Sequence, residues 1–245
     1  MSSEEILNTS GTGHLHPISR AILDIRTIFA EMGFEVAIGP ELETEHYNFD
    51  ALNFPKDHPA RDMQDTFWVK GKNENGERRL LRTHTSPVQI RYMEKKIVAG
   101  IMPPYRVIAP GKVFRNEATD ATHEAQFFQV EGLYVDKNVS LAHLKGTLLY
   151  FFKKFFADDV EVRFRPSFFP FTEPSAEVDM KWKGRWLEMV GSGMVHPNVL
   201  RAAGVPEGYT GFAFGCSIDR PVMLKYGVSD IRLLYGGDLR LVNQL

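Results

Sequence analysis

Five side chains between residues 115 and 131 have the types and the spacing to bind one charged, partly aromatic ligand. Successive side chains on a β-strand point to opposite faces, so Arg115 and Glu117 share one face, and Phe127, Gln129 and Glu131 share another. If the two segments pair so that these faces coincide, a guanidinium, two carboxylates, an amide and an aromatic ring point into one space. A purely structural hairpin would normally bury apolar side chains there and turn its charges outward. The pattern therefore predicts a ligand-binding site.

The residues on either side of these groups predict the hairpin that would carry them. Residues 105–114 and 126–135 are rich in Val, Ile, Phe and Tyr, and the segment between them is polar. This is the pattern of two strands joined by a loop. Pro110-Gly111 interrupts the first strand and predicts a bulge or a bend there.

The remaining elements follow from apolar periodicity and from turn residues. Apolar residues recur at helical spacing from Pro17, and Gly33 is the expected C-cap. Residues 46–66 have no strong periodicity and predict a long surface loop, while the polar residues 1–13 predict a flexible leader. Further helices are expected over 140–156, 197–203 and 217–227, strands over 34–38, 66–70, 79–85, 160–171 and 210–216, and a hairpin over 181–190.

Several polar and aromatic side chains allow two interpretations each. Ser86 opens the run Ser-Pro-Val-Gln, with proline at N1 and a capping box, so its hydroxyl either caps a helix or contacts a ligand. His84, at the expected strand end just before it, is the better ligand candidate. Glu188 lies among Leu, Met and Val and is therefore either paired or bound to a cation. Phe169 and Phe171 fall on one face, where they serve either the core or a ligand.

Two more patterns stay open on the residues alone. Gly211, Ala213 and Gly215 share one face of an expected strand, so a ligand or another element packs closely against them. Glu177 and Asp179 alternate along their segment and either face water or face a ligand.

Composition limits the class of protein. The 245 residues suffice for one substantial core, and 43% hydrophobic and 24% charged residues with a net charge of −2 are ordinary for a soluble domain. That balance gives no global basic signature of a nucleic-acid binder. A single cysteine excludes an internal disulfide, and neither a signal peptide nor a long apolar span is visible. We therefore expect a cytoplasmic protein with no membrane contact.

Four segments in register carry a resemblance to a known family. FRNEATDATHEAQFFQVEG (114–132) resembles motif 2 of a class II aminoacyl-tRNA synthetase, in the form found in the phenylalanyl-tRNA synthetase α subunit. LLRTHTSPVQIRYM ending at Met93, FRPSFFPFTEPSAEVD (164–179) and GFAFGCSIDR (211–220) resemble that family in the same order. The resemblance implies an α+β class II catalytic domain over 14–245, an antiparallel β-sheet flanked by helices. Motif 1 would lie at about 17–42, motif 2 at about 105–135 and motif 3 at about 210–227.

The resemblance also implies roles for the residues above. In the nucleotide site, Arg115 would contact the α-phosphate and the substrate carboxylate, and Arg220 the far phosphates. The complete implied ATP set is Arg115, Glu117, His123, Phe127, Gly215 and Arg220, of which Arg115, Arg220 and His123 would be catalytic. The implied phenylalanine set is His84, Ser86, Gln129, Glu131, Phe169, Phe171 and Ala213, with Gln129 and Glu131 on the ammonium. Glu188 would hold Mg²⁺ against the ATP phosphates.

The sequence departs from the family pattern in two respects. Ser217 and Asp219 stand where the family usually has glycine and glutamate, and Pro221 is unusual. Because proline removes a helical hydrogen bond if Ser217 is the N-cap, the start of the last helix is expected to be shifted, which would move Arg220 and weaken ATP binding. The family's N-terminal coiled coil is expected to be missing, since residues 1–13 are too short for it. We therefore expect a catalytic module that binds tRNA(Phe) weakly when alone.

The function implied is ATP-dependent activation of phenylalanine to phenylalanyl adenylate, followed by transfer to tRNA(Phe). ATP would be a substrate and Mg²⁺ a cofactor, and the partner would be a β subunit in a heterotetramer of two α and two β chains. One alternative is a paralogue that activates phenylalanine, or an analogue, for a carrier other than tRNA. The other is a non-catalytic scaffold, against which the intact Arg115, Glu131 and Arg220 argue.

Overall fold

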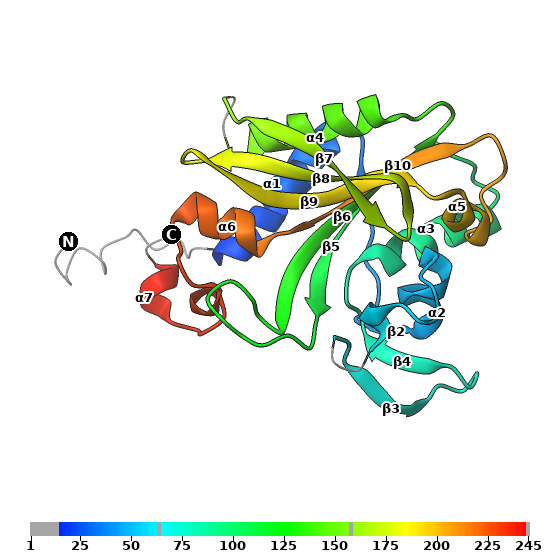
Figure 1. Ribbon diagram of the computed structural model, residues 1–245, viewed down its shortest axis with the longest axis horizontal. Helices are drawn as coiled ribbons and strands as arrows, with labels where there is room; N and C mark the ends of the chain where they lie inside the picture. Colours follow the sequence, from blue (N-terminus) through cyan, green and yellow to red (C-terminus); the bar gives the residue numbers. More distant parts are fainter. Residues whose placement is uncertain (1–14, 63–64, 157–158, 244–245) are drawn as a thin grey trace.

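A twisted sheet of seven strands organises the molecule (Figure 1). The structure is a computed structural model and describes residues 15–62, 65–156 and 159–243. The expected leader, residues 1–13, lies outside the described residues. The strand order is β1 (Glu35–Val36), β5 (Tyr105–Phe114), β6 (Gln126–Asp136), β10 (Thr210–Ser217), β9 (Arg185–Val195), β8 (Thr172–Trp182) and β7 (Val162–Phe169). Only the pair β1–β5 is parallel, so the expected antiparallel sheet is confirmed.

Helices and a small second sheet surround this sheet. The helices are α1 (Pro17–Glu31), α2 (Glu45–Asn48), α3 (Ser86–Val98), α4 (Leu141–Phe155), α5 (Pro197–Ala202), α6 (Asp219–Tyr226) and α7 (Leu239–Val242). Three short 3-10 turns are η1 (Asp50–Leu52), η2 (Pro59–Arg61) and η3 (Ile231–Leu234). The second sheet has the order β2 (Leu42–Thr44), β4 (Arg78–Leu81) and β3 (Trp68–Lys72). Within the described ranges, no helix has both the length and the apolar character to cross a membrane.

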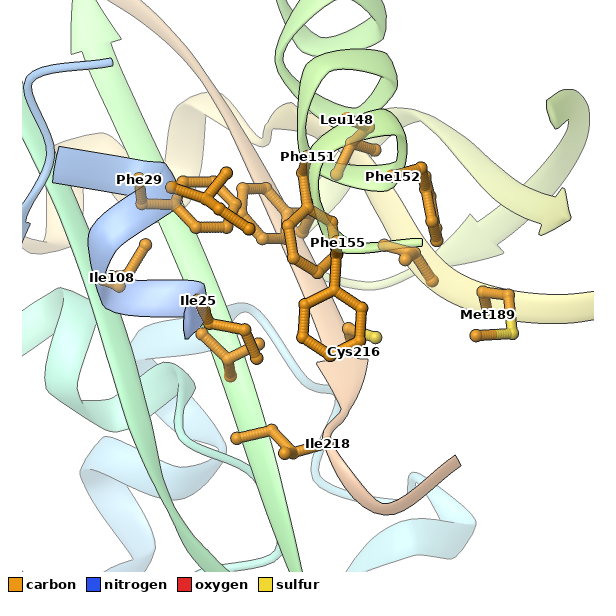
Figure 2. Close-up of a cluster of buried hydrophobic side chains, with 14 of the residues drawn as sticks. Ile25, Phe29, Ile108, Leu148, Phe151, Phe152, Phe155, Met189, Cys216 and Ile218 are labelled. Atoms are coloured by element: carbon orange, nitrogen blue, oxygen red, sulfur yellow. The ribbon is translucent and has the colours of Figure 1, made fainter. Parts of the chain in front are cut away.

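One face of the large sheet packs against α1 and α4 and forms the main core. Phe29 of α1 and Phe151 of α4 point toward each other in this core (Figure 2), and their ring centroids lie 5.3 Å apart. The Phe29 centroid also lies 5.4 Å from that of Phe214 of β10. These rings are fully or almost fully buried, so truncating Phe29 to alanine would cost about 3–5 kcal/mol of stability. Gly132 on the neighbouring strand is required here, because an added Cβ would lie 2.2 Å from the Phe214 ring. This face therefore serves stability.

The opposite face carries a second, smaller cluster and holds the site. Along β5, Ile108 packs in the main core, while its neighbour Val107 packs in the second cluster. The same alternation places Val130 in the main core and Leu133 in the second cluster. Residues from η1, α3 and α5 cover part of this second face. A cavity remains beside them, and the groups predicted to bind a ligand point into it.

The expected bulge at Pro110-Gly111 is wrong. Pairing runs without a register shift from Tyr105↔Val135 to Phe114↔Gln126, through Pro110↔Val130. Among the described residues, β1 pairs with β5 only at Val107 and Ile108. Because no strand lies on the other side of β5 at Pro110, the missing N–H removes no ladder bond.

The segment 46–66 also differs from the expected surface loop. Over its described part it contains α2, η1 and η2, and the side chains of Asn48, Phe49 and Leu52 are buried. Its apolar residues pack beneath the cavity instead of following one helical face, so periodicity could not reveal it. The strand expected over 34–38 is limited to the two residues of β1.

Candidate active site

All of the residues predicted to bind substrate line one cavity of about 880 Å³ on the second face of the sheet. They come from separate elements: β6 and the loop before it, the loop between β4 and α3, the β7–β8 turn, β9, β10 and α6. The cavity has a charged end and an apolar end, and Glu131 lies between them. The role of each residue stays a prediction, but the residues that were predicted to act together do line one cavity.

The β5–β6 hairpin brings Arg115, Phe127, Gln129 and Glu131 onto one face as predicted, and Glu117, in the loop after β5, lines the same cavity. Gly111 pairs with Gln129 and Val113 with Phe127, and the Arg115 N–H donates to Ala125 O at 2.9 Å. Arg115 therefore continues the same face as Phe127. Its guanidinium carbon lies 5.1 Å from the centroid of the Phe127 ring, and its Nε donates to Thr83 O at 3.1 Å. This cation lies over the face of a ring that itself lines the cavity.

Glu131 is a buried carboxylate surrounded by donors from the start of α3. Its Oε1 accepts from the Thr85 N–H at 3.1 Å, and its Oε2 accepts from Ser86 Oγ at 2.5 Å and from Gln89 Nε2 at 3.0 Å. Burial raises the pKa of Glu131 to about 7, against the lowering effect of the Ser86 and Thr85 donors and of Arg115. The carboxyl is therefore poised to titrate near neutral pH.

These donors correct the capping box predicted at Ser86. The helix begins at Ser86 with Thr85 as N-cap, and no side chain caps it. Ser86 and Gln89 use their side chains on Glu131, more than forty positions away in sequence. Gln89, which sequence reasoning assigned to the cap, is a further residue of the site.

His84 and Gln129 present unpaired polar atoms to the cavity. Both ring nitrogens of His84 and the Oε1 of Gln129 are buried without a hydrogen-bond partner in the described part of the chain. Burial, with a contribution from Arg115, lowers the pKa of His84 to about 3, so the ring is neutral. An unpaired buried polar atom costs about 1–3 kcal/mol, which a ligand with polar groups would recover. The strand expected over 79–85 ends at Leu81, so His84 lies in the loop after β4 and not at a strand end as predicted.

Asn48 holds the loop that carries His84. Its Nδ2 donates to Thr83 Oγ1 at 3.0 Å, and its Oδ1 accepts from the Thr83 N–H at 3.2 Å. The residue is fully buried. Sequence reasoning missed it because it lies in the segment predicted as a surface loop.

The apolar end of the cavity is walled by aromatic rings. The ring centroids of Phe169 and Phe171 lie 5.8 Å apart and nearly parallel, and Phe171 lies 5.6 Å from Phe54. Phe54 is a further wall residue that sequence reasoning missed. Gly191 makes room for Phe169, because a Cβ there would lie 2.9 Å from the ring. A flat apolar side chain in the cavity would pack against this aromatic wall.

Ala213 lies at the same end. It pairs with Leu133 on one side and Gly193 on the other, lines the cavity and is 7% exposed. Phe212 and Phe214 lie in the main core, as the alternation predicts. The sequence left open whether a ligand or another element packs against Gly211, Ala213 and Gly215. Because Ala213 borders the cavity, its position favours a ligand.

Arg220 and Glu188 occupy the charged end. Arg220 Nη1 donates to Glu188 O at 2.8 Å. The Glu188 side chain is 57% exposed and lies 3.7 Å from Arg165, so it is loosely paired, which is one of the two alternatives left open by the sequence. His123, at the tip of the β5–β6 loop, lies 3.1 Å from Asp120. Of the other acids left open, Asp179 is buried between Arg163 and Arg165 and is structural.

Glu188 suits a Mg²⁺ ion that is also held by the phosphates of the substrate. Within the described ranges, no group of three or more His, Cys, Asp or Glu side chains is arranged to hold a metal ion. Mg²⁺ is commonly held by one or two carboxylates together with substrate phosphates. A single exposed carboxylate such as Glu188 suits that arrangement. It does not suit a site in which protein side chains alone hold the ion.

Pro221 lies in the first turn of α6. The helix begins at Asp219, and its N-cap is Ile218 instead of Ser217, so the expected shift of the helix start is confirmed. At this position the backbone N–H has no helical acceptor, so proline removes no bond. The helix then ends at Gly227 in a left-handed conformation, as expected.

Comparison with known proteins agrees with this geometry. Residues 5–245 match the family of tRNA synthetases class II core domain (F). The fold is similar to that of pyrrolysyl-tRNA synthetase from Desulfitobacterium hafniense, with a TM-score of 0.71 and 16% identity over 94% of this chain and 76% of that chain. The fold and the site therefore define a class II aminoacyl-tRNA synthetase catalytic domain.

Relatives of higher identity narrow the family. The chain is 55% identical over 244 residues to the phenylalanine–tRNA ligase alpha subunit of Dechloromonas aromatica (strain RCB), covering 95% of this chain and 70% of that protein. It is 54% identical over 246 residues to the corresponding subunit of Pelodictyon phaeoclathratiforme (strain DSM 5477 / BU-1), again covering 95% and 70%. The chain belongs to the family of phenylalanine–tRNA ligase alpha subunits, which confirms the family indicated by its motifs.

Proposed function

We propose that this chain forms phenylalanyl adenylate from phenylalanine and ATP and, with a β subunit, transfers the phenylalanyl group to tRNA(Phe). The observation that carries the proposal is the position of Glu131 between the two ends of one cavity. An amino acid needs an anionic contact for its ammonium, an apolar recess for its side chain and a cationic region for its carboxylate and ATP. The cavity offers all three environments, with the anionic Glu131 between the apolar end and the cationic end.

The proposed chemistry is attack by the phenylalanine carboxylate oxygen on the α-phosphorus of ATP. A new oxygen–phosphorus bond forms, the bond to the bridging oxygen breaks, and pyrophosphate leaves. Two anions must approach, so catalysis rests on positioning and on neutralising charge. Arg115 would contact both the carboxylate and the α-phosphate, a task that suits its planar fork of donors.

Other residues would orient the two substrates. Phe127 would stack on adenine beneath Arg115, with Glu117 accepting from the adenine amino group, and Arg220 with His123 would hold the outer phosphates. Gln129 and Glu131 would receive the ammonium. Mg²⁺ held by Glu188 and the phosphates would supply further positive charge when bound.

The phenylalanine side chain would occupy the aromatic end. Edge and face contacts with Phe169, Phe171 and Phe54 suit a phenyl ring. Ser86 and His84 would line the path between ring and ammonium. The small side chains of Ala213 and Gly215 would leave room for the ring and the nucleotide.

The β subunit would dock at the edge of the sheet formed by β1. Several apolar side chains are exposed in β1 and in the segments next to β1 and α3: Val36, Ile38, Leu42, Val98, Ile101 and Met102. Tyr92 of α3 donates to Glu35, and Lys96 of α3 lies 2.9 Å from it, so the end of α3 adjoins β1. This region corresponds to motif 1 and supports a partner there, in the heterotetramer of two α and two β chains expected for the family. Use of tRNA(Phe) supports a cytoplasmic location.

ATP–pyrophosphate exchange with each amino acid tests the proposal, for the chain alone and for the chain with its β subunit. We expect phenylalanine-dependent exchange, abolished by Arg115→Ala and retained by the control Arg106→Ala on the same strand. Arg106 packs on Tyr134 outside the cavity. Exchange absent in both preparations would contradict the enzyme assignment. Exchange without charging of tRNA(Phe) would favour the alternative of another carrier.

A further inference from the structure

Asp219 is a buried carboxylate at the junction of β10 and α6 for which the reaction above has no use. Its side chain is fully buried. Its Oδ2 accepts from the Phe128 N–H at 2.8 Å, and its Oδ1 accepts from the Tyr235 hydroxyl. The carboxylate therefore joins β6, α6 and the segment that follows α6.

The strand-to-helix junction explains why a carboxylate is needed there. β10 pairs with β6 as far as Ser217↔Gln129, and the Ile218 N–H still donates to Phe128 O at 2.8 Å. In a continuing ladder the Phe128 N–H would donate to Ile218 O. That carbonyl instead accepts from the Val222 N–H at 3.2 Å and begins the helix. The Asp219 carboxylate replaces it, so the Phe128 N–H keeps an acceptor where the chain changes from strand to helix.

Phe128 and Asp219, which this hydrogen bond joins, are each followed or preceded in sequence by a residue of the proposed ATP site. Phe127 precedes Phe128 and lies under the Arg115 guanidinium. Arg220 follows Asp219 and donates to Glu188 O at 2.8 Å. The Asp219–Phe128 bond thus fixes the backbone beside an aromatic ring on one element and a guanidinium on another.

Tyr235 connects the junction to the segment after α6, residues 228–235. In that segment the Ile231 N–H donates to Ala121 O at 2.9 Å, in the loop that carries His123. The Leu234 carbonyl lies 2.9 Å from His16 Nε2 at the start of α1. The segment therefore contacts the motif 2 loop and the motif 3 helix at once, and the Tyr235 hydroxyl is its link to the helix.

The electrostatics of the pair agree with a permanent link. Burial raises the pKa of Asp219 to about 6, while the donors Tyr235 and Phe128 N–H lower it. Burial and the charge of Asp219 raise the pKa of Tyr235, so its hydroxyl remains a donor. Where the family usually has glutamate, this chain has the shorter aspartate, and the tyrosine supplies its second partner.

We propose that Asp219 and Tyr235 are positioning residues that hold Phe127 and Arg220 for ATP, so that the link from residues 228–235 to the start of α6 sets the affinity for ATP. This inference rests on the ATP site proposed above. The pair would act on nucleotide binding and leave phenylalanine binding nearly unchanged, because the rings of Phe54, Phe169 and Phe171 at the aromatic end of the cavity lie on other elements.

The test is exchange kinetics of Tyr235→Phe in the chain purified with its β subunit, varying ATP and phenylalanine separately. Removing the hydroxyl leaves a buried carboxylate oxygen unpaired, and we expect KM for ATP to rise about five- to tenfold while KM for phenylalanine stays within about twofold. Tyr150→Phe is the matched control, since its hydroxyl donates to the Glu31 carboxylate between α4 and α1. The control is expected to leave both KM values unchanged.

Each outcome decides the proposal. An unchanged KM for ATP in folded Tyr235→Phe, or an equal rise in both KM values, would overturn it while leaving the proposed function intact. Absence of exchange in the wild type would overturn the proposed function itself. If Tyr235→Phe does not fold, Asp219→Asn tests the same link, because the amide keeps the shape and weakens the bonds, with an expected rise of about threefold in KM for ATP. Failure of both variants to fold would show a purely structural pair and would overturn the proposal.

Discussion

Acidification is expected to weaken phenylalanine binding through Glu131. Only the ionised carboxylate can pair with the substrate ammonium, and burial raises the pKa of Glu131 to about 7. The groups facing it are the donors of Thr85, Ser86 and Gln89 and the charge of Arg115, which lowers its pKa. Since kcat/KM reports the free enzyme, its value for phenylalanine should fall about tenfold per pH unit below that pKa. His84 does not add to this profile, because its pKa of about 3 keeps it neutral throughout.

The assay is exchange at saturating ATP between about pH 5.5 and pH 8.5, with Glu131→Gln as the comparison. The amide does not titrate, so its profile should lack the inflection of the wild type. At pH 8 the variant should lose about 10- to 150-fold in kcat/KM for phenylalanine, the range for a hydrogen bond to a charged group. A wild-type profile that stays level down to pH 5.5, or the same inflection in Glu131→Gln, would refute the assigned role.

The raised pKa of Glu131 also predicts how the free energy of unfolding depends on pH. The direction of that dependence follows from the linkage between proton binding and folding. The folded state binds the Glu131 proton more tightly than the unfolded state, where the pKa is near 4.5. The free energy of unfolding should therefore fall as pH rises from about 4.5 to about 7, by roughly 3 kcal/mol from this group. The difference in unfolding free energy between wild type and Glu131→Gln isolates the effect, because other titrations cancel. A difference that does not vary over this range would show that the pKa is not raised.

Three further predictions concern the other parts of the site and its support. Ala213→Gly removes a methyl group from the aromatic end, so para-chlorophenylalanine should gain on phenylalanine about tenfold to a few hundredfold in kcat/KM; an unchanged ratio in folded protein would show that the methyl faces elsewhere. Arg115→Ala should lose roughly 3–4 kcal/mol of transition-state stabilisation and more than Arg220→Ala, since Arg115 would contact the reacting phosphate; the reverse order in kcat/KM would exchange the two roles. Gly132→Ala would place a Cβ 2.2 Å from the Phe214 ring, and thermal unfolding should show a loss of about 1–3 kcal/mol, in contrast to Gly146→Ala, where the added Cβ meets no atom within 4 Å.

The site could be predicted from sequence because most of it lies on strands. Strand alternation is a local rule, and it placed Phe127, Gln129 and Glu131 on one face before any partner was known. Their pairing with the Arg115 segment follows from a hairpin, in which the two strands are neighbours in sequence. Local geometry thus sufficed for the half of the site that one hairpin carries.

The segment 46–66 shows where such reasoning fails. Asn48 and Phe54 reach the site from short turns with no repeating period, so their burial depends on elements far away in sequence. A short turn has too few residues to display an amphipathic pattern. The contribution of this segment to the cavity wall could be found only from the three-dimensional arrangement.

Ser86 and Gln89 show a second limit of sequence-based prediction. They have the spacing of a capping box, but the distant carboxylate of Glu131 binds their side chains instead. Their spacing allows a capping box, which would satisfy backbone N–H groups at the helix start. A buried carboxylate left without donors costs more than an uncapped helix end, so Glu131 takes both side chains. Asp219 plays a similar part at the other end of the site. The Ile218 carbonyl accepts from the helix, so the Asp219 carboxylate accepts from the Phe128 N–H in its place. In both places a buried acid decides how a helix begins, and the acid's partner lies too far along the chain for spacing to reveal.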